Sequence, residues 1–528
     1  MSPAAYDYVI VGAGSAGCVL AARLSEDPDV SVLLLEAGGP DDVDEIHIPA
    51  ALYRLFKTAY DWDYTTEPQP QVNGRRLYWP RGRMLGGSSS LNAMLYIRGN
   101  RLDYDTWRDD GAKGWGYQDL LPYFLRAEDN ERGASEFHAE GGPLRVEDQR
   151  FPNPISARVL AAAVDAGIPA NDDFNGAVQD GAGLFQVTQR GGRRWSAADA
   201  YLHPVTHRPN LTIRTDALVY RVLIDGGVAT GVRYSWAGQR CDVRAEREVI
   251  LSGGAINSPQ LLLLSGIGPA AALQAFDIDV LVDAPNVGQR LQDHPIAPAQ
   301  YTTHGVRDLF AAERLPQFAR WFARHTGPLT SPVAEVCAFV RSDPARPAPD
   351  LQFHVIPAML REHGLAPAPA RGLTMCATLV DVASRGAVTL RSADPRHRPA
   401  IDAGYLRESA DLDVLIAGLE IAREIAARPA LAGSLVAEVW PGPSARSRAA
   451  LADHVRAELQ TLYHPTSTCA LGPNDDDVVD LDLQVRGVER LRVVDASVMP
   501  SVPRGNTNAP TIAVAERAAD LISGRNAA

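Results

Sequence analysis

His464 lies in the segment TLYHPTSTCALG (residues 461–472), among small and mostly neutral residues. A histidine can take up a proton near neutral pH, so it can act as a general base where a pocket and suitable partners exist. On this segment alone, a structural role in the core or at the surface is the more common interpretation. The catalytic hypothesis therefore depends on the residues that the rest of the chain supplies.

A glycine pattern near the N-terminus predicts a dinucleotide site. Gly12, Gly14 and Gly17 follow the apolar run YVIVGA, precede CVLAARLSE, and are followed by VSVLLLE, which ends on Glu36. In such a strand–turn–helix–strand unit the glycines allow a tight turn, backbone approach to a pyrophosphate, and close helix packing. The helix N-terminus offers N–H groups to phosphate, and Glu36 accepts hydrogen bonds from a ribose. The carboxylate argues against NADP but does not separate NAD from FAD.

The composition indicates a globular chain. It has 528 residues, of which 46% are hydrophobic and 22% charged, and its length predicts two to four domains. The net charge of −13 gives no basic surface for nucleic acid. The most apolar run, LLLLSGIGPAAAL, is interrupted by Gly266, Gly268 and Pro269 and is shorter than the ~20 residues of a membrane helix.

The five cysteines and twelve histidines are scattered and have no metal-ligand or redox spacing. We therefore expect reduced thiols and no metal site. No signal peptide is recognised after MSPAAYD, so the expected location is the cytoplasm, with peripheral contact to the inner membrane left open.

Five further segments resemble, in the same order, motifs of the glucose–methanol–choline (GMC) flavoprotein oxidoreductases. They are PRGRMLGGSSSLNAMLYIRGN (80–100), GGAINSPQLLLLSGIGP (253–269), NVGQRLQDHP (286–295), YHPTSTCALG (463–472) and LRVVDASVMPSVPRGNTNAPTIAVAERAADLI (491–522). The resemblance covers essentially the whole chain and is strongest to bacterial dehydrogenases of medium-chain alcohols, followed by choline dehydrogenases. The family implies FAD rather than NAD.

The resemblance also implies how FAD is held. The segment GGSSSLN with Asn92 suits contact with a pyrophosphate or a flavin edge. Some members link FAD covalently through a histidine at the position of Leu91, so this chain is expected to bind FAD noncovalently. Trp62 is either a flavin contact or an ordinary packing residue. The predicted cofactor-binding residues are Gly12, Ala13, Gly14, Ser15, Ala16, Gly17, Glu36, Trp62, Gly87, Asn92, Ala93, Met94, Val219, Asp495, Ala496, Asn506 and Thr507.

Two helix starts are predicted from local residues. Ser258 is expected to be an N-cap, with Pro259 as the first helical residue. Asn508 is expected to cap the final helix, with Pro510 in its first turn. The positive end of that final helix, directed at the flavin pyrimidine ring, would stabilise the negative charge that hydride transfer creates.

By motif position, the resemblance implies that His464 and Asn506 form the catalytic pair. The histidine would take the hydroxyl proton of an alcohol while hydride leaves for flavin N5, and the amide would hydrogen-bond the developing alkoxide. Asn508, two residues away, is the alternative to Asn506. The predicted substrate residues are Glu335, His354 and Tyr463. The alternatives are a buried structural ion pair for Glu335 and a hydrogen-bonded core position for His354.

The cofactor segments lie at the start, middle and end of the chain, which predicts an α/β fold with a discontinuous domain. We expect a doubly wound, Rossmann-like FAD domain formed by residues 1–150, 205–300 and 462–528. Residues 151–204 and 301–461 would form an α+β substrate domain, a sheet backed by helices, with the flavin at the junction. The amphipathic segment 307–327 either shields the entrance or packs as a surface helix.

The leading functional hypothesis is oxidation of a primary alcohol to an aldehyde, with choline oxidation as the alternative in the same class. A quaternary ammonium would need an aromatic cage, to which Tyr463 would contribute, with Glu335 nearby. Alternatives of another class are a hydroxynitrile lyase-like enzyme and a flavin photodecarboxylase. The sequence does not distinguish oxygen, a quinone or another carrier as electron acceptor, nor does it give the oligomeric state.

Overall fold

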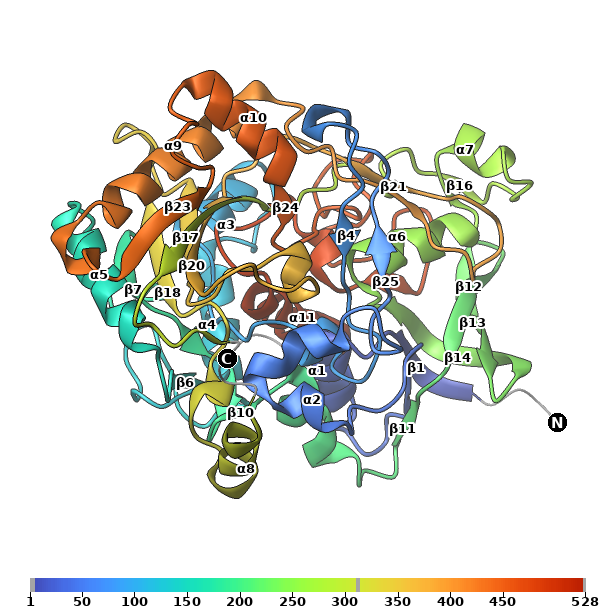
Figure 1. Cartoon of the computed structure of the whole chain (residues 1–528). Helices are drawn as coiled ribbons and strands as arrows, with labels where there is room; N and C mark the ends of the chain where they lie inside the picture. The colour runs from blue at the N-terminus through green and yellow to red at the C-terminus, as the bar shows by residue number, and fades with distance from the viewer. Residues whose placement is uncertain (1–4, 310–313, 526–528) are drawn as a thin grey trace.

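Two seven-stranded sheets organise the computed structural model, which describes residues 5–309 and 314–525 (Figure 1). In the first sheet the central strands are parallel: β1 pairs in parallel with β2 and with β14, and β14 pairs in parallel with β25. On one side the sheet continues with antiparallel pairs, β14 with β13 and β13 with β12. Its strands, in spatial order, are β11 (Leu211–Arg214), β2 (Val32–Leu35), β1 (Ala5–Val11), β14 (Gln239–Leu251), β13 (Val228–Trp236) and β12 (Leu218–Asp225), with β25 (Leu491–Val493) beside β14.

The strand–helix–strand unit predicted from the glycine pattern is present. The apolar run before Gly12 forms β1, helix α1 (Ser15–Leu24) follows the turn, and β2 ends one residue before Glu36. Helix α1 packs against α11 (Asn508–Ser523), and Arg23 of α1 pairs with the fully buried Glu516 of α11 at 2.9 Å. The two ends of the described chain therefore meet in one layer beside the first sheet.

The second sheet is antiparallel throughout. Its strands, in spatial order, are β23 (Leu435–Trp440), β17 (Pro295–Thr303), β20 (Gly372–Leu379), β19 (Leu351–Ile356), β18 (Val336–Val340) and β7 (Gly181–Leu184), with β24 (Gln460–Thr461) beside β17. Helix α9 (Ser409–Ala426) packs on β17, β19 and β20, with α10 (Arg448–Glu458) and α5 (Pro154–Asp165) against it (Figure 1). This is a sheet backed by helices.

The strands of the first sheet all lie within the segments predicted to bind FAD. Those of the second lie within the segments predicted to bind substrate, except that β17 crosses the predicted boundary at residue 300. Because β17 pairs with β20 over its length, the second sheet begins at Pro295. The assignment of each part to cofactor or substrate stays a prediction.

Helix α6 (Gly254–Leu264) begins four residues before Ser258, so the predicted start at this position is wrong. Pro259 lies inside the helix and cannot donate to the carbonyl of Ala255, four residues earlier. That carbonyl instead accepts a hydrogen bond from the Thr468 hydroxyl at 2.7 Å. A donor from a distant segment thus allows the helix to continue through the proline.

The final helix also begins differently from the prediction. Thr507 is the N-cap residue of α11 and Asn508 is its first helical residue. The Asn508 side chain does not cap the helix, because its Oδ1 accepts a hydrogen bond from the Ser15 hydroxyl at 2.7 Å. Asn508 therefore joins the starts of α1 and α11.

Helix α8 (Leu315–Arg324) is the described part of the amphipathic segment, of which residues 310–313 lie outside the described residues. Trp321 is buried and donates to the Gly192 carbonyl at 3.0 Å, whereas Leu315 and Phe322 are exposed. Among the described residues, no helix is both long and apolar enough to cross a membrane.

The remaining helices and strands are short. They are α2 (Asp44–His47), α3 (Arg101–Asp109), α4 (Tyr117–Ala127), α7 (Ala270–Gln274), β3 (Tyr64–Thr65), β4 (Tyr78–Trp79), β5 (Glu128–Asn130), β6 (Leu144–Asp148), β8 (Gln186–Val187), β9 (Gln189–Arg190), β10 (Arg193–Arg194), β15 (Ile267–Gly268), β16 (Val282–Asp283), β21 (Ala387–Thr389) and β22 (Ala400–Asp402).

Candidate active site

A cavity of about 390 Å³ lies between the two sheets. One end is lined by the glycine turn after β1, the end of β2 and the start of α6. The other end is lined by residues of β17, β19 and β20 and by the segment that contains His464. The cavity therefore joins the predicted dinucleotide site to the predicted catalytic histidine. No residue of α8 lines it, which fits the surface-helix interpretation of that segment.

The three glycines have different surroundings. Gly12 has a φ of +101°, and a Cβ there would lie 2.5 Å from the Ser252 carbonyl oxygen. A Cβ on Gly17 would lie 1.8 Å from the Gly12 carbonyl oxygen, so only glycine allows α1 to approach the turn. Around Gly14 no atom lies within 4 Å of such a Cβ, and Gly14 lines the cavity. The turn thus leaves open backbone where a pyrophosphate would bind.

Glu36 closes this end of the cavity and is 5% exposed. Its carboxylate accepts hydrogen bonds from the backbone N–H groups of Ala13 at 2.8 Å and Gly38 at 2.9 Å. Burial raises the pKa of Glu36, and these two N–H groups oppose the rise. The acid lies at the end of β2, where the pattern places a ribose ligand.

Most of the other predicted cofactor residues also line the cavity. Trp62 stacks on Tyr64 with ring centroids 5.8 Å apart and planes 4° apart, so it both packs and faces the cavity. The Asn92 side-chain oxygen accepts from the Met94 N–H and from Arg194, each at 2.9 Å, which fixes the loop. Of the predicted cofactor residues, Ala13 and Gly17 are the two that do not line the cavity.

His464 and Asn506 meet on the cavity wall, although they are 42 residues apart. His464 Nε2 lies 3.3 Å from Asn506 Nδ2, and each residue is 9% exposed. The backbone N–H of His464 donates to Asp293 Oδ1 at 2.6 Å, which anchors the segment. Burial, together with nearby His294 and His354, holds the pKa of His464 well below its ordinary value. An unprotonated imidazole is the form that can accept a proton.

The structure adds two residues that the sequence analysis missed. His294 Nδ1 lies 3.0 Å from His464 Nδ1, and Gln352 Nε2 donates to Asn506 Oδ1 at 3.3 Å. His294 is in the family motif NVGQRLQDHP, yet it is 170 residues from His464, and no local pattern reveals the contact. The motif itself was the available signal.

The three predicted substrate residues have different positions. Tyr463 and His354 line the cavity, and His354 Nδ1 lies 3.0 Å from the Thr378 hydroxyl. Glu335 does not line it. The Glu335 carboxylate instead accepts hydrogen bonds from the hydroxyls of Ser156 and Ser331, both at 2.7 Å, and from the Asn153 N–H at 2.6 Å. All three donors are neutral. Glu335 is therefore buried, as the structural alternative predicted, but these partners are hydrogen-bond donors and do not form the ion pair that this alternative included.

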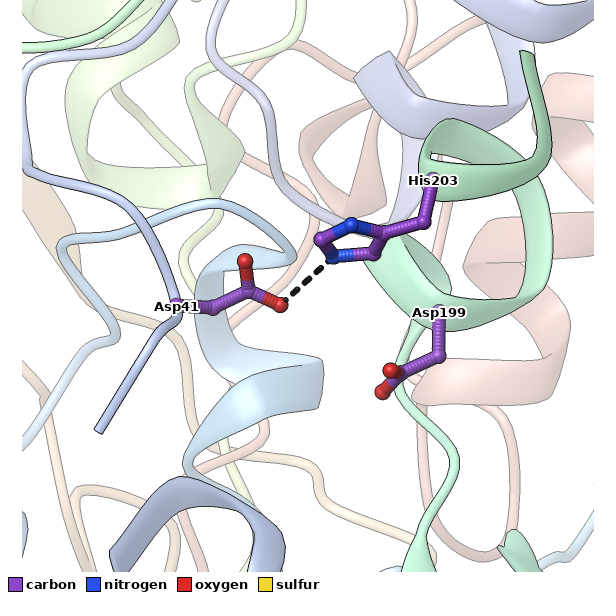
Figure 2. A group of neighbouring side chains, drawn as sticks. All are labelled: Asp41, Asp199 and His203. Carbon is purple, nitrogen blue, oxygen red and sulfur yellow. Dashed lines mark hydrogen bonds and ion pairs between the residues drawn. The ribbon is translucent and has the colours of Figure 1, made fainter. Parts of the chain in front are cut away.

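A separate group of potential metal ligands lies outside the cavity (Figure 2). His203 Nε2 is 3.0 Å from Asp41 Oδ2, and Asp199 is nearby. The hydrogen bond to Asp41 raises the pKa of His203. An ion pair between a half-exposed histidine and a buried aspartate accounts for this contact, and no spacing in the sequence indicates it.

Comparison with known proteins identifies the family of this chain. The N-terminal model of the GMC oxidoreductases matches residues 6–296, and the C-terminal model matches residues 382–515. The chain belongs to the GMC oxidoreductase family. It is 46% identical to a mitochondrial choline dehydrogenase of Mus musculus, over 99% of this chain and 90% of that protein. It is 44% identical to an alcohol dehydrogenase [acceptor] of Pseudomonas putida, over 98% of this chain and 95% of that protein.

Solved structures of this GMC family agree with the fold. Pyridoxine 4-oxidase from Mesorbium loti superposes with a TM-score of 0.89 at 35% identity, covering 97% of this chain and 98% of that one. A formate oxidase of Aspergillus oryzae RIB40, studied for its FAD modification, superposes with a TM-score of 0.92 at 29% identity, covering 99% of each chain. The GMC fold predicted from the ordered motifs is confirmed.

Proposed function

We propose that this GMC oxidoreductase uses FAD to oxidise a primary alcohol to an aldehyde, with His464 as general base. The observation that carries the proposal is the pairing of His464 Nε2 with Asn506 Nδ2, 3.3 Å apart on the wall of a cavity that reaches the glycine turn. A hydroxyl oxygen placed between the two groups would meet a proton acceptor and an amide donor at once.

The roles of the two side chains follow from their chemistry. The O–H bond of the substrate breaks, and its proton passes to the lone pair of His464 Nε2. The Asn506 amide has no proton affinity near neutral pH, so it can donate to the developing alkoxide without competing for that proton. Each residue is only 9% exposed, and this partial removal from water strengthens these interactions.

The residues at the other end of the cavity fit FAD. Open backbone at Gly14 and the close approach of Gly87, where an added Cβ would lie only 2.7 Å from Gly14 Cα, would form a cradle for the pyrophosphate. Glu36 would hold the ribose, and the start of α11 at Thr507 would face the flavin. When bound, FAD supplies the acceptor for the hydride that leaves the alcohol carbon.

We further propose that FAD is held noncovalently, since the buried Leu91 has no atom that can form the histidyl link found in some relatives. Acid precipitation of the purified protein should release all of the yellow flavin into the supernatant. Yellow colour retained by the washed, denatured pellet would contradict the proposal.

The substrate end of the cavity favours an uncharged alcohol over choline. Its lining includes Leu52, Phe56, Val333, Ile356, Leu360 and Leu462. Lys57 lies over the Tyr78 ring at 5.0 Å, and Lys57 and Arg75 act with burial to lower the pKa of His363 to about 4. The buried acids near this end, Asp61 and Asp293, already accept hydrogen bonds from Tyr78 and from the His464 N–H. Glu335, the acid predicted to attract a quaternary ammonium, points to Ser156 and Ser331 instead.

Anaerobic mixing with substrates tests the function. Neutral primary alcohols such as octanol and benzyl alcohol should bleach the flavin, and choline should do so much more slowly. If choline bleached the flavin faster, the choline alternative would replace this assignment. If cyanohydrins were split without bleaching and no alcohol reduced the flavin, the lyase alternative would be correct.

A further inference from the structure

The segment Gln292–Pro295 contacts His464 at two points. Asp293 Oδ1 accepts from the His464 backbone N–H, while Asp293 Oδ2 accepts from the Thr461 hydroxyl at 2.6 Å. The next residue, His294, is fully buried and brings its ring edge-on to that of His464, with an angle of 84° between the planes. One segment thus holds both the backbone and the ring of the proposed base.

The contact between the two rings constrains their protons. The Nδ1 atoms of His294 and His464 are 3.0 Å apart, so a hydrogen bond between two neutral rings requires a proton on one of them and a lone pair on the other. If His464 donates, its Nε2 carries the lone pair. If His294 donates, His464 Nε2 carries the proton and cannot act as a base.

The far side of Asn506 favours the first arrangement. Gln352 Nε2 donates to Asn506 Oδ1 at 3.3 Å, which leaves the Asn506 amide N–H group directed at His464 Nε2. A donor facing Nε2 is compatible with a lone pair there and opposes a second N–H.

The surroundings of His294 point in the same direction. Burial lowers the pKa of His294 to about 3, so its ring is neutral. The nitrogen turned away from His464 is the buried Nε2, which has no partner within hydrogen-bond distance among the described residues. The Val380 backbone raises the pKa of the ring and so opposes the effect of burial, which is compatible with a proton on Nε2. His294 Nδ1 is then an acceptor.

We infer that His294 is a positioning residue that accepts a hydrogen bond from His464 Nδ1 and so keeps the lone pair of His464 Nε2 directed at the substrate. The inference rests on the proposed role of His464 as base. It assigns a function to the histidine of the NVGQRLQDHP motif, which does not line the cavity itself and contacts His464, which does.

A pair of variants of the FAD-loaded enzyme tests the inference. In His294→Leu the acceptor is lost, and the rate of anaerobic flavin reduction by a good alcohol should fall by about 10²-fold, with little change in the KM for the alcohol. In His294→Asn the side-chain oxygen can replace Nδ1 as acceptor, so most of the wild-type rate should return. Equal rates for the leucine variant and the wild type, or an asparagine variant as slow as the leucine one, would overturn the inference.

A second measurement does not depend on turnover. The ring nitrogens of the enzyme, labelled with 15N-histidine, can be assigned to His464 by their loss in His464→Ala. The wild-type spectrum should show a protonated Nδ1 and an unprotonated Nε2 for His464, and the His294→Leu spectrum should lose this preference. The opposite tautomer in the wild type would reject the inference, and slow flavin reduction in His464→Ala would then still show that the reaction needs His464. An enzyme whose flavin no alcohol reduces would reject the proposed function itself.

Discussion

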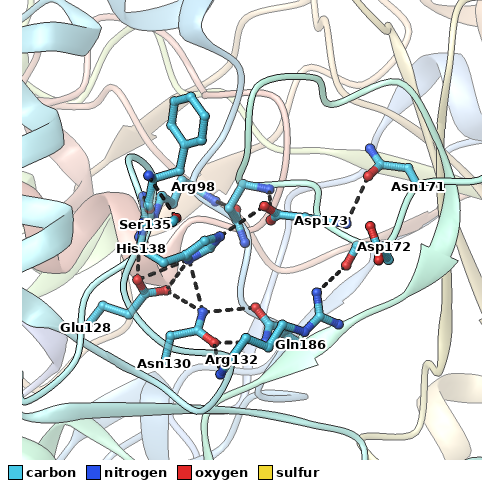
Figure 3. Close-up of polar contacts among 12 residues, drawn as sticks. Arg98, Glu128, Asn130, Arg132, Ser135, His138, Asn171, Asp172, Asp173 and Gln186 are labelled. Atoms are coloured by element: carbon cyan, nitrogen blue, oxygen red, sulfur yellow. Dashed lines mark hydrogen bonds and ion pairs between the residues drawn. The ribbon is translucent and has the colours of Figure 1, made fainter.

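Two buried regions of this chain, the cavity and the surroundings of His138, each contain a histidine and a glutamate. In each region one of these residues has a pKa above its ordinary value and the other has a pKa below it. At the cavity, burial and neighbouring histidines lower the pKa of His464, and burial raises that of Glu36. Burial also lowers the pKa of His138, but hydrogen bonds to Asp173 and Glu128 outweigh this effect and raise it to about 9 (Figure 3). Burial raises the pKa of Glu128 too, yet Arg98 and His138 bring it below its ordinary value.

The difference lies in the partners. His138 lies 3.1 Å from both Glu128 and Asp173, and Arg98 pairs with Glu128 at 2.8 Å, so each buried charge meets an opposite one. His464 contacts another histidine and an amide, and Glu36 contacts backbone N–H groups. In the first kind of region, loss of one partner leaves an uncompensated buried charge and destabilises the fold, whereas groups kept neutral or unpaired remain available to a ligand.

Replacement of His464 should produce the largest effect and should separate rate from stability. His464→Ala should bind FAD normally but reduce it about 10²–10⁴-fold more slowly with a good alcohol, because the positioned base is absent. Stopped-flow absorbance under anaerobic conditions measures this rate. A wild-type rate in this variant would make His464 a packing residue like those of the His138 region.

The pH dependence sharpens the same comparison. The base works when neutral, and burial lowers its pKa, so wild-type flavin reduction should stay constant as the pH falls through 6.5 and decline only at lower pH. Asn506→Ala should be slow but should keep this acid decline, since the amide does not titrate. Loss of the decline in Asn506→Ala would show that another group titrates.

Glu36 should matter for the cofactor, although a glutamine in its place keeps only one of the two backbone hydrogen bonds from Ala13 and Gly38. Glu36→Gln removes the charge but keeps nearly the same shape, so the affinity for FAD should fall about 10–100-fold, the usual range for a charge-assisted hydrogen bond. Titration of the apoprotein with FAD, followed by flavin fluorescence, gives the Kd. Unchanged affinity would show that the ribose does not contact this acid.

His138 should show the smallest effect, on stability alone. His138→Leu should lower the free energy of unfolding by about 1–3 kcal/mol below pH 6.5, where the folded and unfolded forms of the wild type both carry the proton. The folded pKa of about 9 exceeds the ordinary value of 6.5, so this contribution should decrease as the pH rises between them and vanish above the higher one. Urea unfolding at several pH values measures it, and a difference independent of pH would indicate lost packing instead.

Local patterns were sufficient for the parts of the fold that depend on neighbouring residues. The strand, turn and helix around Gly12, Gly14 and Gly17 are determined by backbone sterics within about thirty residues, and the sequence predicted them correctly. The order of the family motifs then predicted that segments far apart in the sequence form one domain and that a second sheet lies beside it. Both features are present in the structure.

Contacts between distant segments could not be predicted in this way. The start of α6 was misplaced because the donor that compensates for Pro259 belongs to Thr468. Glu335 was expected to face the substrate, but its orientation is determined by Ser156 and Ser331. His294 was visible within a motif, and only the folded chain shows that it contacts His464.

The pairing of β25 with β14 and of α11 with α1 also has a consequence for biosynthesis. The glycine turn is complete within the first forty residues, but β25, which pairs with β14, and α11, which packs on α1, lie beyond residue 490. At roughly 5–20 residues per second, a ribosome needs about 20 to 90 seconds to make the intervening chain. A nascent chain therefore waits, with β14 lacking β25 and α1 lacking α11, until these late segments have left the ribosome.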